Sequence, residues 1–421
     1  GPSEDGRQNP EAQRYVLVPP RCVHTPIMSA RRVYGIGAIE SPSLRTSYPH
    51  PHPFPILTHL LEPSFLTCTV TSRATTATAT KNESAKSTGA YAKELEVATD
   101  AVRMASTLCQ EVQGQLMRQD EQAVTKDDKS LVTLADYAAQ AIISWRIQQE
   151  WPDFTMVGEE DAEALVEGGE GGTQTLEKIT NLVNKTLRHH KGDSAPVLSS
   201  GDLVTLIDKG KGSGGQGRHW VLDPVDGTLG FVRGDQYAIA LALMEDGDLK
   251  LGAMGCPNMP KMGEVLEYDS SYTYGFSPRL VSKMLAGESL GWFKGCLFTA
   301  VKGQGSFMSP CDASLKVDPV PVKVSELFDP STAKFCEPVM KANSSQGFTA
   351  SVADNLAIAS KPLRVYSQVK YGSVARADAD VYMRFPKAGY KEKIWDHAAG
   401  VIVVEEAGGK VTDAGGSPLN W

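Results

Sequence analysis

The chain has 421 residues, of which 41% are hydrophobic and 22% are charged, and its formal net charge at pH 7 is −8. This length suffices for two or three domains with substantial cores. The acidic balance argues against a surface for nucleic-acid polymers, and the apolar runs are far shorter than the roughly 20 residues of a membrane span. The composition therefore predicts a globular protein that binds small molecules, with neither a nucleic-acid polymer nor a membrane as partner.

The first ninety residues differ in composition from the rest of the chain. Between residues 28 and 89 Arg, Ser and Thr are abundant, acidic residues are few, and residues 49–55 read PHPHPFP. This composition is typical of a transit peptide, and a merely disordered tail is the alternative. We therefore expect residues 1–90 to form a disordered leader that directs the protein to the chloroplast, or alternatively to the mitochondrion.

The seven cysteines are an odd number and include neither a CxxC pair nor a Cys/His metal spacing. Such usage favours reduced thiols over a disulfide framework. A regulatory disulfide is the alternative that the sequence leaves open.

Periodic apolar positions predict the first elements of the folded part. In residues 91–118 apolar side chains recur three and four positions apart, which predicts a long helix with one buried face. Further helices are expected over 131–151, which ends before a proline, and over 174–189. The apolar runs 237–244 and 249–254, joined by Glu-Asp-Gly-Asp, predict a β-hairpin. Periodicity alone thus indicates a mixed α/β protein with two subdomains.

One apolar run ends abruptly in Asp-Pro-Val-Asp-Gly-Thr at residues 223–228. The proline removes a backbone donor and the glycine permits a sharp change of direction, so the chain is expected to leave a sheet here. Asp223 and Asp226 could then point at one hard cation, and the peptide between them could add a carbonyl oxygen, which is a ligand set that Mg²⁺ prefers. An ordinary surface turn is the alternative interpretation.

Two other acidic segments follow or precede apolar runs. Residues 154–161 read FTMVGEED, and residues 393–409 read KIWDHAAGVIVVEEAGG, with Asp396 at the start of a helical pattern. Considered separately, the first is typical of a solvated loop and the second of a helix N-cap.

Together, the three acidic segments resemble those of the inositol monophosphatase superfamily, and their surroundings resemble its 3′(2′),5′-bisphosphate nucleotidase branch. The resemblance runs from about residue 91 to the C-terminus. It rests on WVLDPVDGT at 220–228, GFVRGDQYAIALAL at 230–243, GCPN at 255–258, SQVKYG at 367–372 and EKIWDHAAG at 392–400.

The resemblance implies an α/β fold of the layered αβαβα type. Its two subdomains would be a metal-binding one over residues 91–255 and a substrate-binding one over residues 256–421. It also implies a phosphatase that converts adenosine 3′,5′-bisphosphate to AMP, in sulfur assimilation and nucleotide salvage. Whether the 5′-phosphosulfate analogue is a second substrate stays open.

The resemblance further implies the roles of individual residues. Asp136 would be the catalytic base, and it would hold the Thr228 hydroxyl that orients the attacking water. Two or three Mg²⁺ ions would be bound by Glu159, Asp223, the Val225 carbonyl, Asp226 and Asp396. The nucleotide, the small-molecule partner of a monomeric enzyme, would be contacted by Thr228, Ser367, Lys370, Arg384 and Asp396.

The chain departs from the family pattern at several places. Leu229 stands where the motif usually has Lys, and the sequence stops at Trp421, where family members continue with a strand and a helix. We therefore expect a shortened C-terminal subdomain in which a sheet edge and the apolar residues 401–404 are uncovered. Two alternative functions stay open, namely an inositol polyphosphate 1-phosphatase and a low-activity paralogue that acts as a binding module.

Overall fold

The computed structural model describes most of the chain beyond the expected leader. The described residues are 15–18, 89–119, 126–261, 292, 294–341, 344–386 and 390–421, with the backbone alone for 15–18 and 126–130. Apart from residues 15–18, 89 and 90, the expected leader lies outside the described residues. No helix in these ranges is both long and apolar enough to cross a membrane.

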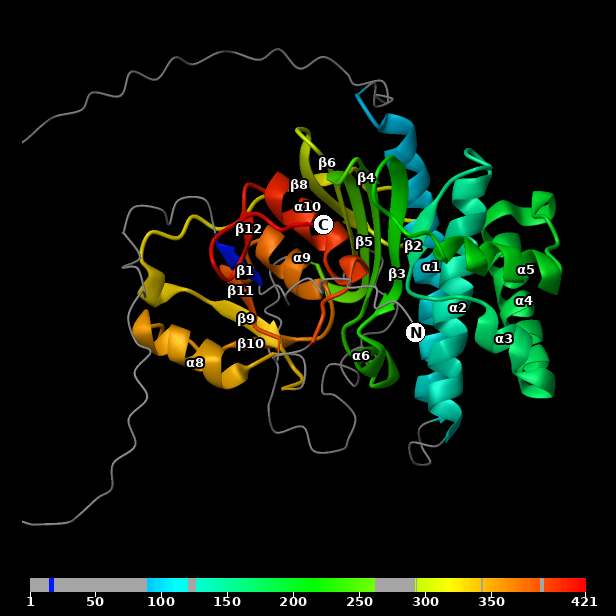
Figure 1. Ribbon diagram of the computed structural model, residues 1–421, viewed down its shortest axis with the longest axis horizontal. Helices are drawn as coiled ribbons and strands as arrows, with labels where there is room; N and C mark the ends of the chain where they lie inside the picture. The colour runs from blue at the N-terminus through cyan, green and yellow to red at the C-terminus, as the bar shows by residue number, and fades with distance from the viewer. Residues whose placement is uncertain are drawn as a thin grey trace, which may run out of the picture. The chain divides into compact units, whose positions relative to one another are not determined.

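The elements form alternating layers of helices and sheets (Figure 1). Helices α1 (Ala92–Gln119) and α2 (Lys126–Gln148) pack together, and α1 covers one face of a seven-stranded sheet. Helices α9 (Val369–Ala375) and α10 (Ala398–Glu406) lie between this sheet and a five-stranded sheet. Helix α8 (Gln346–Asn355) packs on the five-stranded sheet through Ala353. These layers confirm the αβαβα sandwich that the sequence predicts.

The seven-stranded sheet has the order β2-β3-β4-β5-β6-β7-β8. Only β2 and β3 are parallel, and every other neighbouring pair is antiparallel. The β4 and β5 strands form the predicted hairpin. The strand bounds are β2 (Met156–Gly158), β3 (Arg218–Asp226), β4 (Ala238–Glu245), β5 (Asp248–Pro260), β6 (Lys294–Val301), β7 (Gly305–Pro310) and β8 (Val320–Val322).

Strand β4 shows why its sequence is a continuous apolar run, because both of its faces are buried. Ile239, Leu241 and Leu243 belong to the core under α1 and α2. The alternate residues, such as Ala240 and Ala242, belong to the core under α9 and α10, where their small size lets a helix approach closely. At Gly252 on the neighbouring strand, an added Cβ would lie 2.5 Å from Ile402 Cγ2. Helix α10 is therefore seated directly on the sheet.

Three more helices pack on α2, or on one another beside it, and complete the outer layer. They are α3 (Glu163–Glu167), α4 (Gly169–Lys191) and α5 (Ser200–Ile207). Ser199 caps α5 in a reciprocal capping box with Asp202. Helix α4 begins five residues earlier than the apolar pattern predicts. Short 3₁₀ turns are η1 (Gly192–Ser194), η2 (Asp208–Gly210), η3 (Pro330–Thr332) and η4 (Ile394–Asp396).

The five-stranded sheet contains a strand from the expected leader. Its order is β10-β9-β11-β1-β12, where β1 (Tyr15–Val18) is antiparallel to both of its neighbours. The other strands are β9 (Phe335–Pro338), β10 (Leu363–Val365), β11 (Val381–Arg384) and β12 (Lys410–Asp413). Residues 15–18 therefore differ from the expectation of a wholly disordered leader. A four-residue apolar run, Tyr-Val-Leu-Val, suits an interior strand of a sheet.

The expected domain boundary between residues 255 and 256 falls inside β5. The sheet that begins in the first expected subdomain continues through β8, since β5 pairs with both β4 and β6. Antiparallel pairing across this point joins strands from both expected subdomains, β2 to β8, in one sheet. The expectation of uncovered apolar residues at 401–404 is also wrong. Their exposed fractions are 2% or less, because α10 is enclosed between the two sheets.

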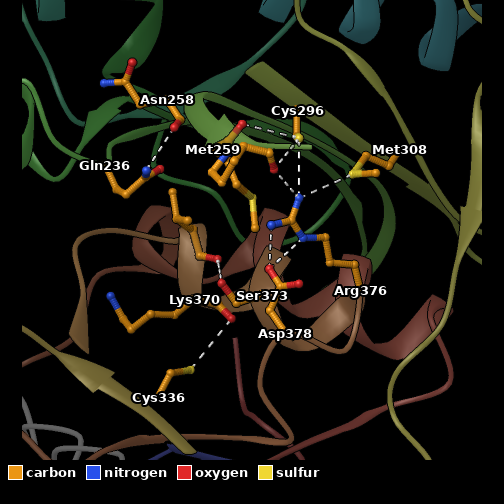
Figure 2. A network of polar contacts seen from close by, with 12 residues as sticks. Gln236, Asn258, Met259, Cys296, Met308, Cys336, Lys370, Ser373, Arg376 and Asp378 are labelled. Atoms are coloured by element: carbon orange, nitrogen blue, oxygen red, sulfur yellow. Dashed lines mark hydrogen bonds and ion pairs between the residues drawn. The ribbon is translucent and has the colours of Figure 1, made fainter. Parts of the chain in front are cut away.

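Arg376, at the C-terminal end of α9, ties the middle layer to the seven-stranded sheet (Figure 2). Its Nε lies 2.7 Å from Asp378 Oδ2, and its guanidinium donates to the Pro260 carbonyl at 2.6 Å and to Cys296 Sγ at 3.6 Å. Cys296 is one of five cysteines among the described residues, all of them buried free thiols. Cys296 accepts from Arg376 and also donates to the Met259 carbonyl at 3.6 Å, while Cys336 donates to the Lys370 carbonyl at 3.9 Å.

Candidate active site

The parallel pair β2 and β3 brings two acidic segments together. Gly158 is paired with Leu222, so Glu159 and Asp223 leave adjacent strand positions. Strand β3 is irregular between Asp223 and Asp226, and this irregularity contains the buried Val225. The sequence prediction that the chain changes course at Asp-Pro-Val-Asp-Gly-Thr agrees with this geometry.

Gly227 allows the sharp turn that follows. Its φ is +91°, a left-handed conformation that favours glycine, and a Cβ placed there would lie 2.8 Å from Ser367 Cβ. The exposed Thr228 then begins helix α6 (Thr228–Val232), which contacts α2. Because α2 carries Asp136, the proposed orienting hydroxyl and the proposed base are on contacting helices.

Gln140 fixes the acidic turn after β2 to helix α2. Its side chain is fully buried and donates to the Ile207 carbonyl at 2.7 Å and to the Glu160 carbonyl at 2.5 Å. Its Oε1 accepts from the Glu160 amide at 3.2 Å. Gln140 lies one helical turn after Asp136, on the same face of α2. The sequence analysis missed it, although a single glutamine in the apolar run ADYAAQAII is a detectable signal.

Gln368 likewise fixes two segments to each other through hydrogen bonds, in the second half of the site. Its backbone amide donates to Asp226 Oδ2. Its side-chain Nε2 donates to the Trp395 carbonyl at 2.9 Å, and its Oε1 accepts from the Gly400 amide at 3.3 Å. One buried residue thus links Asp226 to the turn η4 that carries Asp396, and the sequence analysis missed this residue too.

We call Asp136, Glu159, Asp223, Asp226 and Asp396 the acidic cluster. Burial, followed by Asp226 and Glu159, raises the pKa of Asp223 well above its usual value. Burial and then Asp226 raise the pKa of Asp396 to about 7. The pKa of Asp136 is also raised well above its usual value, by burial and then by the two glutamates that follow β2. Asp223 is the common neighbour, because each of the other four carboxylates raises its pKa.

The cluster fits a divalent cation. Asp223 is 2% exposed, and its Oδ1 has no hydrogen-bond partner among the described residues. A buried anionic oxygen without a donor is costly, and several carboxylates around it add electrostatic repulsion. A hard divalent cation coordinated by carboxylate oxygens removes both costs.

Two of the predicted substrate residues, Ser367 and Lys370, have different surroundings in the structure. Ser367 is half-buried with a positive φ of +62° and adjoins Gly227. Lys370 is 2% exposed, with its Nζ 3.1 Å from the Val365 carbonyl, near the Ser367 carbonyl and 5.4 Å from the centre of the Tyr382 ring. Burial lowers the Lys370 pKa to about 8, although Asp226 opposes this effect. Its ammonium group therefore holds the strained Ser367 backbone in place.

Arg384 ends β11 and faces the acidic cluster. Its guanidinium lies 3.5 Å from Asp396 Oδ2. Burial raises the pKa of Asp226, and the charges of Lys370 and then Arg384 oppose this rise. The nearer partner is Glu392, at 2.6 and 2.8 Å. The structure thus brings the predicted metal ligands and Arg384 into one site, and it adds Glu392 to that site.

A layered α/β fold that gathers five carboxylates, with Asp136 and Asp223 buried, at two strand ends and a helix start is typical of proteins that bind divalent cations. Comparison with known proteins identifies the family. The profile described as the inositol monophosphatase family matches residues 91–421. This chain therefore belongs to the inositol monophosphatase family.

Two plant relatives are similar to this chain over most of their own length. The 3′,5′-bisphosphate nucleotidase AHL of Arabidopsis thaliana is 44% identical over 342 residues, which cover 78% of this chain and 88% of the relative. The 3′(2′),5′-bisphosphate nucleotidase of Oryza sativa is 43% identical over 336 residues, covering 79% and 86%. Among solved structures, an inositol monophosphatase from Zymomonas mobilis aligns with 18% identity and a TM-score of 0.45, covering 79% of this chain and 90% of that chain.

The raised pKa values predict how the stability of the metal-free protein depends on pH. Burial raises the pKa of Asp396 and of Glu160 to about 7, above unfolded values of about 4. The folded state therefore binds more protons, and stability is lost as pH rises from about 4 to about 7. With a chelator, we expect the melting temperature to fall by roughly 5 °C over this window.

Calorimetry with and without Mg²⁺ checks this expectation. Mg²⁺ should raise the melting temperature more at pH 8 than at pH 5, because protons and the cation compete for the same oxygens. A Mg²⁺ effect that is equal at both pH values would contradict the assignment of the acidic cluster.

Proposed function

We propose that this chain is a Mg²⁺-dependent phosphatase that removes the 3′-phosphate of adenosine 3′,5′-bisphosphate to give AMP. The observation that carries the proposal is the acidic cluster around the partnerless Asp223 Oδ1. The choice of a nucleotide is supported by the relatives at 43% and 44% identity that are named as bisphosphate nucleotidases.

Two or three Mg²⁺ ions would be held by the acidic cluster. Glu159, Asp223 and the Val225 carbonyl would hold one ion, and Asp223, Asp226 and Asp396 a second. A third would be near Asp136. When bound, the ions would supply a lowered pKa for water and positive charge for the phosphate oxygens.

The chain's own residues orient the reactants. The Thr228 hydroxyl orients the attacking water, and Asp136 takes the proton of that water while the new oxygen–phosphorus bond forms. The raised pKa of Asp136 makes this carboxylate a stronger proton acceptor than a free aspartate. The bond from phosphorus to the ribose 3′ oxygen breaks, and that oxygen takes up a proton. Arg384 binds the phosphate, and Ser367 contacts the nucleotide.

The proposal is tested by measuring phosphate release from adenosine 3′,5′-bisphosphate and from inositol 1,4-bisphosphate in parallel. We expect Mg²⁺-dependent release from the nucleotide, with kcat/KM at least about tenfold higher than for the inositol compound, which corresponds to about 1.4 kcal/mol of transition-state binding. Preference for the inositol compound would instead indicate an inositol polyphosphate 1-phosphatase. Nucleotide binding without release of phosphate would indicate a binding module.

A further inference from the structure

Glu392 holds the guanidinium of Arg384 in a buried, two-pronged ion pair. Glu392 Oε1 accepts from Arg384 Nε at 2.8 Å, and Oε2 lies 2.6 Å from a terminal guanidinium nitrogen of Arg384. The exposed fractions of the two side chains are 2% and 12%. A bidentate pair of this kind fixes the plane of the guanidinium as well as its position.

The carboxylate of Glu392 is itself held from behind. Its Oε2 lies 3.1 Å from His397 Nε2, and His397 Nδ1 lies 2.6 Å from the hydroxyl of Tyr371. His397 is 1% exposed, and Tyr371 belongs to the core under α9 and α10. The orientation of Arg384 is thereby connected to the packed middle layer.

Arg384 has a second carboxylate within reach. Asp396 Oδ2 is 3.5 Å from the same terminal nitrogen that Glu392 contacts at 2.6 Å. Asp396 belongs to the acidic cluster, and its negative charge attracts a guanidinium as well as a metal ion. The distances show that Glu392 is the preferred partner of Arg384 and that Asp396 is the alternative.

We propose that Glu392 is a positioning residue that keeps Arg384 away from the oxygen atoms of Asp396, so that these oxygens stay available to a divalent cation. Arg384, held in this way, points its remaining donors at the substrate phosphate. Without Glu392, the guanidinium pairs with Asp396 and competes with the cation. The part of the proposal that concerns the phosphate rests on the proposed function, and the part that concerns the cation does not.

Among the described residues, ligand-capable atoms of Glu392, Asp396 and His397 lie within 4.8 Å of one another. Both oxygens of Glu392 already contact Arg384 or His397. We therefore interpret this arrangement as a support that holds Arg384 in place through hydrogen bonds. The distances therefore assign Glu392 the role of holding Arg384.

The test replaces Glu392 by Gln in the full chain, which keeps the size of the side chain and removes its charge. Melting temperature is measured during titration with Mg²⁺ alone. We expect the Mg²⁺ midpoint to rise about tenfold, which is the lower range for loss of a residue that supports a metal ligand. At saturating Mg²⁺ we expect KM for adenosine 3′,5′-bisphosphate to rise more than kcat falls.

Glu337→Gln is the matched control. Glu337 on β9 pairs with Arg364 on β10 at 2.9 and 3.0 Å, and its side chain is 2% exposed. It is also a pair between a buried carboxylate and an arginine, although it uses a single oxygen and its arginine is 32% exposed, and it lies outside the acidic cluster. Glu337→Gln should lower the melting temperature and leave the Mg²⁺ midpoint unchanged.

A double variant separates positioning from simple loss of charge. In an Arg384→Met background the competing guanidinium is absent, so Glu392→Gln should have no further effect on the Mg²⁺ midpoint. A tenfold shift that persists there, or no shift in the single variant, overturns the proposal. If the unmodified chain releases no phosphate from the nucleotide, the proposed function fails, while the Mg²⁺ titration still decides the role of Glu392.

Discussion

Asp223→Asn is expected to lower kcat for adenosine 3′,5′-bisphosphate by more than about a hundredfold, since even residues that only support a metal ligand typically contribute 10- to 100-fold. Asp223 would supply oxygens to two ions, and it lies at the centre of the acidic cluster with a partnerless Oδ1. The substitution should also change stability in opposite directions. In chelator it removes buried repulsion and should raise the melting temperature, whereas the gain on adding Mg²⁺ should largely disappear.

Asp161→Asn is the control for this prediction. Asp161 follows β2, the strand after which Glu159 also lies, and its Oδ1 accepts from the Glu163 amide at 2.8 Å on the surface. It is outside the proposed ligand set, so its loss should change kcat by less than about threefold, as is usual for an exposed hydrogen bond. Equal losses in the two variants would show that the ligands are assigned wrongly.

Gly227→Ala is expected to lower both stability and activity. The new methyl group requires an L-residue at a φ of +91° and would lie 2.8 Å from Ser367 Cβ. The left-handed conformation alone costs about 1–2 kcal/mol, and relief of the contact moves Ser367 or the segment that carries Asp226 and Thr228. A displacement of about 1 Å at a reacting group can reduce the rate about a hundredfold. Unfolding by urea and steady-state kinetics measure the two effects.

Gly247→Ala separates the cost of the backbone from the cost of the contact. Gly247, between β4 and β5, has a φ of +78°, and a Cβ there would meet nothing within 4 Å. The free energy of unfolding of the Gly247→Ala variant should fall by a similar amount because of the strained φ. Its kcat should stay unchanged. An active Gly227→Ala variant would mean that Ser367 and the Asp226 segment tolerate displacement.

Local sequence patterns correctly predicted the elements that a short stretch of residues defines by itself. The apolar stripe of residues 91–118 predicted α1, and two apolar runs with a turn between them predicted the β4–β5 hairpin. The domain boundary was placed within GCPN, whereas these residues continue β5. The coverage of residues 401–404 also depends on a distant sheet, which no local pattern contains.

The candidate site, too, could be predicted only where a short sequence motif defines it. Asp223 and Asp226 could be found from their turn, and the family resemblance added residues such as Asp136 and Glu159. Sequence reasoning did not find Gln140 and Gln368, because each acts through partners that are remote in sequence. It also missed Glu392, whose partner Arg384 is eight residues away but lies on a different element, β11. It also gave Lys370 a contact with nucleotide, whereas the structure shows an ammonium group that is buried against backbone carbonyls.

The position of β1 sets the order in which the two sheets can form during synthesis. The seven-stranded sheet joins mostly sequential neighbours, so it can assemble while the chain is still being made. In the five-stranded sheet, Tyr15 pairs with Arg384 on one side and with Asp413 on the other. This sheet can be completed only after almost all of the given sequence has emerged from the ribosome. Until then, the edges of β11 and β12 that β1 covers are open to strands of other molecules, so this interval is when the nascent protein most needs a chaperone.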